Sequence, residues 1–112
     1  MKWIKLDIQL PENDFVGMVI VNGHKRCLIQ HHREIYLIQN TCPHAGGLLS
    51  GGWCENDHIV CPIHRWSYHL KTGRGAEGQG DAIDIYPVEK RTDGVYVGIK
   101  ESLWKRLFGS SG

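Results

Sequence analysis

The chain has 112 residues, with 13 basic and 12 acidic side chains and a formal net charge of +1. This length favours one domain, spanning residues 1–112, and the near-neutral charge gives no basic stripe for nucleic-acid binding. No apolar run reaches the roughly 18 residues that a membrane helix needs, and no signal-peptide pattern is present at the N-terminus. We therefore expect a cytoplasmic protein with no nucleic-acid or membrane partner.

Short apolar runs separated by turn residues predict strands along most of the chain. An Asn22-Gly23 pair lies between two such runs and predicts a hairpin, because both residues tolerate positive φ. A last hairpin is expected around residues 92–94. The sequence therefore predicts an all-β chain. The expected strands are 3–6, 18–21, 25–29, 34–39, 58–60, 66–70, 82–88 and 94–99.

Three stretches depart from the strand pattern. Residues 41–53 and 71–80 are rich in glycine, which is typical of flexible surface loops. The first of these stretches adjoins potential metal ligands, so we expect a tightly folded site loop there. Residues 101–108 are predicted to form a short helix that caps the sheet core, with docking of a partner as the alternative. The apolar residues on one side of this helix are Leu103, Trp104, Leu107 and Phe108.

Two short motifs carry the chemistry. Cys42-Pro43-His44 is followed, after sixteen residues, by Cys61-Pro62-Ile63-His64. Each motif offers one thiolate and one imidazole, and each contains a proline that stiffens the loop. A two-iron cluster with inequivalent irons needs two thiolates on one metal and two imidazoles on the other. Two loops that each supply one ligand to each iron would satisfy that need.

A single structural zinc ion is the rival interpretation, because zinc also accepts two cysteines and two histidines. Zinc sites usually contain Cys-x-x-Cys or His-x3–5-His pairs that chelate one ion from one turn. No Cys-x-x-Cys pair is present. His64 and His69 have a zinc-like spacing, but pairing them would leave His44 without a role beside Cys42. The spacing therefore favours the cluster.

The two motifs and the residues around them resemble the Rieske [2Fe–2S] protein family. The stretches that carry this resemblance are 42–49, 61–68, 71–73, 86–88 and 93–97, and the likeness spans about residues 3–100. It implies a Rieske fold of antiparallel sheets with a small cluster-binding subdomain at about 41–68. It also implies that Cys42 and Cys61 hold the inner iron, whereas His44 and His64 hold the outer iron near the surface.

Departures from the family pattern point to its soluble ferredoxin or oxygenase branch. The respiratory branch has a disulfide between the two loops, but Ile63 occupies the second-loop position here. Trp66 replaces that branch's serine, and Arg65 replaces the usual glycine after the last histidine, which puts a cation beside the cluster. Tyr68 is a candidate hydrogen-bond donor to a cluster sulfur ligand, with ordinary core packing as the alternative.

The remaining cysteines and histidines are expected to be structural or solvated. Cys27 reads as a buried small hydrophobe within a strand, and Cys54 as a structural thiol. A bond between them is not expected in the cytosol. Several histidines lie at predicted turns and are expected to be solvated: His24, His31, His32 and His58.

The resemblance implies a one-electron carrier, similar to ferredoxins that pass electrons from a flavin reductase to a terminal oxygenase. The alternative is the small subunit of an assimilatory NAD(P)H nitrite reductase, which shares the fold but often lacks the ligands. A complete oxygenase needs a further domain with a second iron site, and only twelve residues follow Lys100. We therefore expect an electron-transfer component that catalyses no reaction alone.

Overall fold

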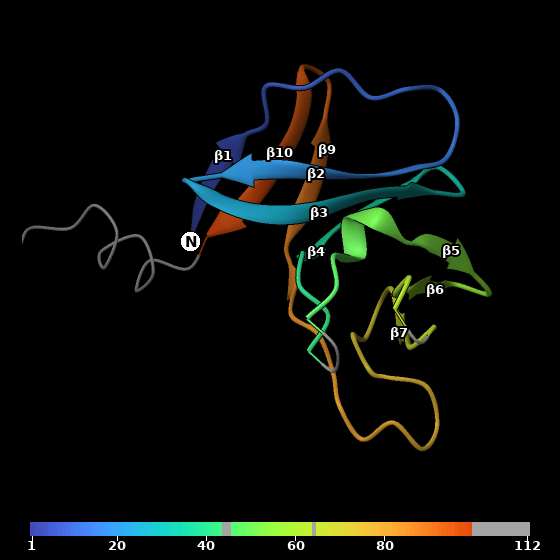
Figure 1. The fold of residues 1–112 in the computed structure, drawn as a ribbon. Coiled ribbons are helices and arrows are strands. Elements are labelled where there is room, and N and C mark those ends of the chain that lie inside the picture. The colour runs from blue at the N-terminus through green and yellow to red at the C-terminus, as the bar shows by residue number, and fades with distance from the viewer. Residues whose placement is uncertain (44–45, 64, 100–112) are drawn as a thin grey trace, which may run out of the picture.

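The computed structural model describes residues 1–43, 46–63 and 65–99, and the regular secondary structure in these ranges is almost entirely β-strand (Figure 1). In the described part of the chain, the one helical element is a 3-10 turn, η1 (Leu49–Gly51), and no helix is long and apolar enough to cross a membrane. The predicted helix 101–108 lies outside the described residues. The strands are β1 (Lys2–Lys5), β2 (Phe15–Val21), β3 (His24–His31), β4 (Glu34–Gln39), β5 (Trp53–Glu55), β6 (His58–Val60), β7 (Ser67–His69), β8 (Ile85–Tyr86), β9 (Val88–Arg91) and β10 (Gly94–Ile99).

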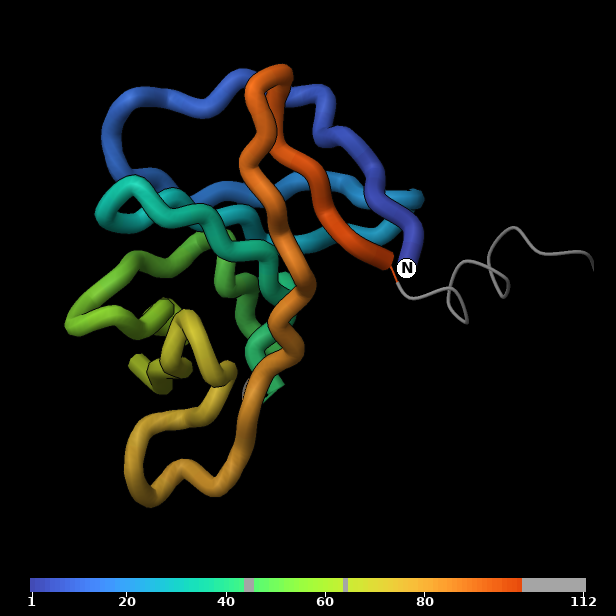
Figure 2. Tube along the Cα trace, turned by 180° about the vertical axis from the view of Figure 1, so that it is seen from behind, coloured from blue at the N-terminus to red at the C-terminus, as the bar shows by residue number. Residues whose placement is uncertain are grey.

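These strands form three antiparallel sheets, which confirms the predicted fold class. The sheets have the orders β1-β10-β9, β2-β3-β4-β8 and β5-β6-β7. Figure 1 shows the β5–β7 sheet below the long β2–β3 hairpin, with the loop 70–84 extending beneath it. Figure 2 shows β9 and β10 passing in front of the β2–β4 sheet when the molecule is seen from behind.

The β2-β3-β4-β8 sheet, called the middle sheet from here on, has a hydrophobic core on each of its two faces. Successive side chains of a strand point to opposite faces. Cys27 and Ile29 of β3 accordingly pack into the core shared with the β5–β7 sheet, whereas Leu28 packs into the core shared with β10. All three are fully buried. This double burial explains why the strand reads as a continuous apolar run rather than as an alternating one.

Three hairpin turns use left-handed backbone. Asn22-Gly23 has φ angles of 51° and 79°, and it joins β2 to β3 as the sequence predicts. The turns His32-Arg33 (50° and 68°) and Asn56-Asp57 (47° and 60°) adopt the same geometry. Arg33 and the preceding histidine are unusual in this conformation, which favours glycine, asparagine and aspartate.

The predicted strand 82–88 is wrong in its extent, because the structure divides it at Pro87. Ile85–Tyr86 pairs with β4 of the middle sheet, whereas Val88–Arg91 pairs with β10 of the neighbouring sheet. Proline has no N–H to donate to a sheet ladder, so the chain changes sheets at this residue. The prediction also missed β5 (Trp53–Glu55), a short strand at the end of the first glycine-rich stretch.

Candidate metal centre

Cys42 and Cys61, which lie far apart in the sequence, meet inside the core beneath the middle sheet. Cys42 follows β4 and Cys61 follows β6, and their exposed fractions are 1% and 0%. Their sulfurs lie close enough to interact directly, yet the two cysteines form no disulfide. The other two predicted ligands, His44 and His64, lie outside the described residues. The structure thus brings together the two cysteines of the predicted set.

A backbone hydrogen bond closes the loop that follows each cysteine. The N–H of Cys42 donates to the carbonyl of Gly47 at 2.7 Å, and the N–H of Cys61 donates to the carbonyl of Trp66 at 2.7 Å. In the first loop, Gly46 also donates to the carbonyl of Cys42 at 2.9 Å. These bonds fix the backbone from which each sulfur projects.

The two loops pack directly against each other at Gly47. A methyl group added to this glycine would lie 2.6 Å from Cγ1 of Ile63 and 3.2 Å from Sγ of Cys61. Real side-chain contacts are not that close, so the glycine is required for space rather than for backbone freedom. Close packing between Gly47 and Ile63 therefore joins the loops where the respiratory branch would use a disulfide.

Tyr68 contacts one of the two sulfurs. Its hydroxyl lies 3.5 Å from Sγ of Cys42 and donates to Oδ2 of Asp81 at 2.9 Å. The side chain is fully buried in β7. Tyr68 therefore contacts a sulfur, but its hydroxyl hydrogen goes to Asp81, so donation to the sulfur stays a prediction. The ring also fills the core, as the packing alternative expects.

Gln79 and Asp81 attach the second glycine-rich stretch to β7. The Gln79 side chain accepts a hydrogen bond from the N–H of Ser67 at 3.0 Å and donates to the carbonyl of Ser67 at 3.0 Å. It thus satisfies the backbone of β7 as a neighbouring strand would. The carbonyl of Asp81 accepts from the N–H of Gly75 at 2.9 Å. Sequence reasoning missed both side chains, since neither belongs to a recognisable motif.

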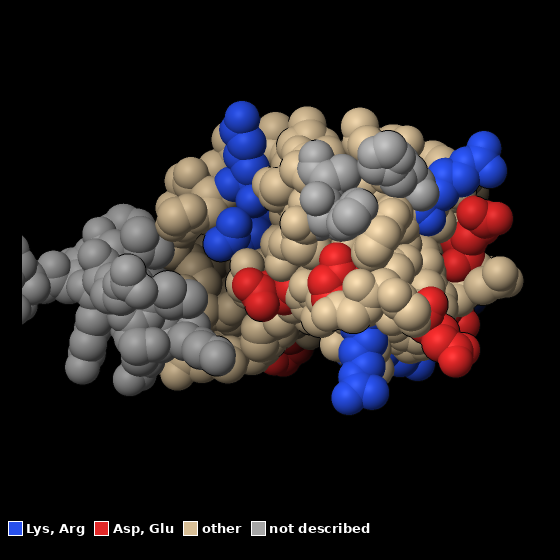
Figure 3. Space-filling view, turned by 60° about the horizontal axis from the view of Figure 1, so that its bottom comes forward, with Lys and Arg blue, Asp and Glu red and all other residues tan. Residues whose placement is uncertain are grey.

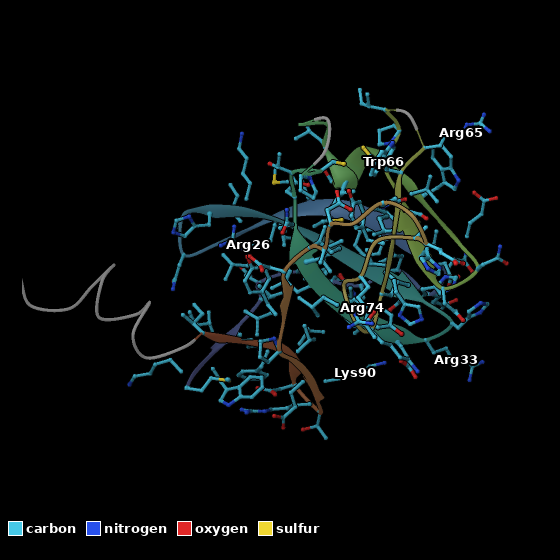
Figure 4. The ribbon with its side chains drawn as sticks, turned by 90° about the horizontal axis from the view of Figure 1, so that it is seen from below. Arg26, Arg33, Arg65, Trp66, Arg74 and Lys90 are labelled. Atoms are coloured by element: carbon cyan, nitrogen blue, oxygen red, sulfur yellow. The ribbon has the colours of Figure 1, made fainter. Side chains whose placement is uncertain are left out.

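Arg65 lies on the surface, whereas Trp66 is hydrogen-bonded to the backbone of Cys61. Arg65 has a φ of 56° and is exposed, and Figure 4 shows its side chain pointing away from the molecule. This left-handed backbone explains why glycine is usual at the position. Trp66 is partly buried against the core and contributes the carbonyl that receives the Cys61 N–H. Arg65 is therefore a surface cation beside the second loop.

The environment of the sulfurs suits bound metal better than free thiols. Burial raises the pKa of Cys61, the backbone N–H of Ile63 lowers it, and the adjacent Cys42 raises it again. Burial also raises the pKa of Tyr68, so its hydroxyl keeps its proton. Two adjacent buried thiolates need a cation to balance their charge. Cys42 and Cys61 therefore fit the inner, thiolate-bound iron of a [2Fe–2S] cluster.

The other two cysteines lie in strands rather than in the two motif loops. Burial and, to a smaller extent, the neighbouring Cys54 raise the pKa of Cys27 to about 12, and burial raises the pKa of Cys54 to about 11. Both therefore remain neutral thiols at physiological pH. Cys27 is fully buried, as the sequence predicts, and Cys54 is half-buried in β5.

Apolar side chains surround the exposed ends of the two loops. Leu48 is 55% exposed and Ile63 is 44% exposed. Figure 3 shows this end of the molecule mostly covered by uncharged side chains, with acidic side chains near its middle and basic side chains towards its edges. Exposed apolar residues with a polar border are typical of a protein-binding surface.

Comparisons with known proteins agree with this geometry. Residues 2–87 match the profile of the Rieske [2Fe-2S] domain family. The ferredoxin component of a naphthalene 1,2-dioxygenase system from Pseudomonas aeruginosa is 36% identical over 79% of this chain and 86% of its own length.

Two solved structures share the fold. A chain in the complex of reduced oxygenase and oxidized ferredoxin in carbazole 1,9a-dioxygenase has a TM-score of 0.72 and 24% identity, covering 86% of this chain and 92% of its own. A putative NADH-dependent nitrite reductase small subunit from Mycobacterium tuberculosis has a TM-score of 0.73 and 16% identity, covering 88% and 96%.

The contact between the loops can be tested with Gly47→Ala. The added methyl group collides with Ile63, so we expect the melting temperature to fall by the equivalent of about 1–3 kcal/mol, the usual cost of overpacking. Iron content should fall with it. Gly51→Ala is the matched control, because its added methyl group would lie 3.9 Å from the nearest atom, in Pro62. Adding Ile63→Ala to Gly47→Ala should restore part of the loss, and no coupling between these two changes would contradict the packing account.

Proposed function

Because the chain belongs to the Rieske [2Fe-2S] domain family, we propose that it carries single electrons from a flavin reductase to a terminal oxygenase. The observation that supports this most is the pair of buried, adjacent cysteine sulfurs with Tyr68 in contact with one of them. When bound, the cluster accepts and releases one electron at a time.

The proposed ligands are the four residues of the two motifs. Cys42 and Cys61 would supply the two thiolates from inside the core, and His44 and His64 would supply the two imidazoles. Each loop contributes one ligand of each kind, so packing at Gly47 would set the separation of both pairs. The zinc interpretation predicts a different metal content and is an outcome of the first test below.

The proposed partner surface surrounds the second loop. His64 lies in sequence between Ile63 and Arg65, which are both exposed. If the thiolates lie in the core, electrons would leave by the histidine edge. A partner would then contact the apolar Leu48 and Ile63, with the Arg65 cation at their side. The similar chain that occurs in a complex of oxygenase and ferredoxin supports an oxygenase as this partner.

The nitrite reductase small subunit is the alternative, and the neighbour from Mycobacterium tuberculosis is the observation in its favour. That likeness is one of fold, at 16% identity, whereas a relative at 36% identity is a ferredoxin component. The complete set of four candidate ligands also favours the carrier. The free thiols of Cys27 and Cys54 fit a reducing compartment, which supports a place in the cytoplasm.

Metal analysis tests the proposed cofactor and its ligands. Protein purified without oxygen should contain about two iron and about two acid-labile sulfide per chain, as a [2Fe–2S] cluster requires. Separate alanine substitutions of Cys42, His44, Cys61 and His64 should each abolish this content. Cys27→Ala is the matched control, because this buried cysteine is proposed to bind no metal and the variant should keep its cluster. Stoichiometric zinc without sulfide would overturn the proposal.

Stopped-flow kinetics test the partner surface. Arg65→Glu should slow electron transfer to the oxygenase by about two- to tenfold at low ionic strength, because reversing a charge at an interface rim mainly changes the association rate. The difference should shrink as salt screens the charge. Lys90→Glu makes the same charge change on β9, which Figure 4 shows on the opposite side from Arg65, and should have no effect. Equal rates for all three proteins at every ionic strength would count against this surface.

A further inference from the structure

A second group of potential metal ligands lies away from the cysteines, where two hairpin turns meet. His31 ends β3, His32 begins the turn to β4, and Asp57 belongs to the turn between β5 and β6. One ligand atom from each of the three lies within 4.8 Å of the others. Figure 1 shows both turns at the same side of the molecule, one above the other.

His31 is enclosed between two carboxylates. Its Nδ1 lies 3.4 Å from Oδ2 of Asp14, and its Nε2 lies 3.4 Å from Oδ1 of Asp57. The side chain is 12% exposed, so the prediction of a solvated histidine is wrong. The chain places the histidine at the end of a strand, but the carboxylates come from segments far from it in sequence.

The Nε2 atom of His31 lacks a hydrogen bond although it is buried. Its contact with Asp57 is close enough for electrostatic attraction, but the geometry does not make a hydrogen bond. A buried polar nitrogen without a partner is costly and needs an explanation. Metal-binding histidines usually have one ring nitrogen on a carboxylate and the other on the metal. Asp14 and the unpartnered Nε2 of His31 reproduce this arrangement.

The distances suit a small divalent ion. Two ligands at about 2.0–2.1 Å from a tetrahedral zinc ion lie about 3.3–3.4 Å apart. This matches the 3.4 Å between Nε2 of His31 and Oδ1 of Asp57. His32 is exposed, and its ring centroid is 4.0 Å from that of His31. One of its ring nitrogens lies within 4.8 Å of the ligand atoms of His31 and Asp57.

His32 and Asp57 lie in hairpin turns whose left-handed backbone fixes their position. Both have left-handed φ angles, 50° and 60°. The N–H of His32 donates to Oδ1 of Asp14 at 3.1 Å, so the carboxylate that contacts His31 also supports the turn. Left-handed backbone at residues other than glycine often occurs at functional sites.

We propose that His31, His32 and Asp57 form a binding site for Zn²⁺ or a similar divalent ion of a first-row transition metal. Two imidazoles and a carboxylate suit Zn²⁺, and three protein ligands leave a fourth position for water. Asp14 is a positioning residue that orients His31. A bound ion connects the β3–β4 turn to the β5–β6 turn and so fixes the β5–β7 sheet against the middle sheet. This site shares no residue with the proposed cluster ligands.

Calorimetric titration of the cluster-loaded protein with Zn²⁺ tests the site. The wild-type protein should bind one ion, and His32→Asn and Asp57→Asn should each weaken binding by at least about tenfold, the least that loss of a supporting residue costs. Asparagine tolerates left-handed backbone, so both variants preserve the turns. An unchanged cluster spectrum during the titration shows that zinc is not replacing iron.

Two matched controls separate this site from other histidines. His24→Ala removes an exposed histidine at the start of β3. His69→Ala removes one member of the His58–His69 pair, whose ring centroids are 5.0 Å apart. Both variants should bind Zn²⁺ as the wild type does. The ion should also raise the melting temperature of the wild type more than that of Asp57→Asn, because tighter binding to the folded state stabilises it more.

The proposal is overturned by any of three results. One is the absence of Zn²⁺ binding to the wild-type protein. Another is equal affinity in His32→Asn, Asp57→Asn and the wild type. The third is loss of binding in His69→Ala alone, which would assign the ion to the His58–His69 pair.

Discussion

Two buried cysteine sulfurs lie side by side without a bond between them, and the rest of this structure depends on how they are kept there. Burial and their mutual proximity oppose ionisation, as the raised pKa of Cys61 indicates. The backbone N–H of Ile63 opposes that effect, and close packing at Gly47 fixes the separation of the two loops. The protein thus replaces a covalent link between the loops with contacts that exclude water and donate hydrogen bonds towards sulfur. Such a site is stable when bound iron balances the thiolate charge.

Tyr68 couples this site to the loop beneath it. One hydroxyl hydrogen lies between two acceptors, the Cys42 sulfur and the Asp81 carboxylate, once the sulfur is bound to metal and carries no proton. Asp81 lies in the stretch that Gln79 attaches to β7, so the loop and the sulfur compete for the same hydrogen. The carboxylate would also place a negative charge near the proposed cluster. Competition from Asp81 for the hydroxyl hydrogen and the negative charge of its carboxylate both oppose addition of an electron. A hydrogen bond from the hydroxyl to the sulfur favours it.

The sequence allowed correct prediction of features that depend on local chemistry. The Asn22-Gly23 turn follows from positive φ, and the family resemblance follows from two motifs and is confirmed by the match over residues 2–87. Features that depend on contacts between distant segments were missed. Pro87 divides a predicted strand because the chain changes sheets there, and Asp81 gains its role only when the loop folds onto Tyr68. The ligand assignment and the subdomain at 41–68 stay predictions, as does the helix at 101–108, which lies outside the described residues.

The reduction potentials of two variants, measured by direct electrochemistry at neutral pH, test the role of Tyr68 most directly. Tyr68→Phe should lower the potential by about 40–65 mV, because a hydrogen bond worth about 1–1.5 kcal/mol in the reduced form is lost. Asp81→Asn should raise it, since the change removes a negative charge and leaves the hydroxyl hydrogen to the sulfur. Tyr96→Phe, which removes a hydroxyl bonded to Asp93 on the far sheet, should leave it unchanged. Shifts of the same sign in Tyr68→Phe and Asp81→Asn, or no shift in either, would contradict the account.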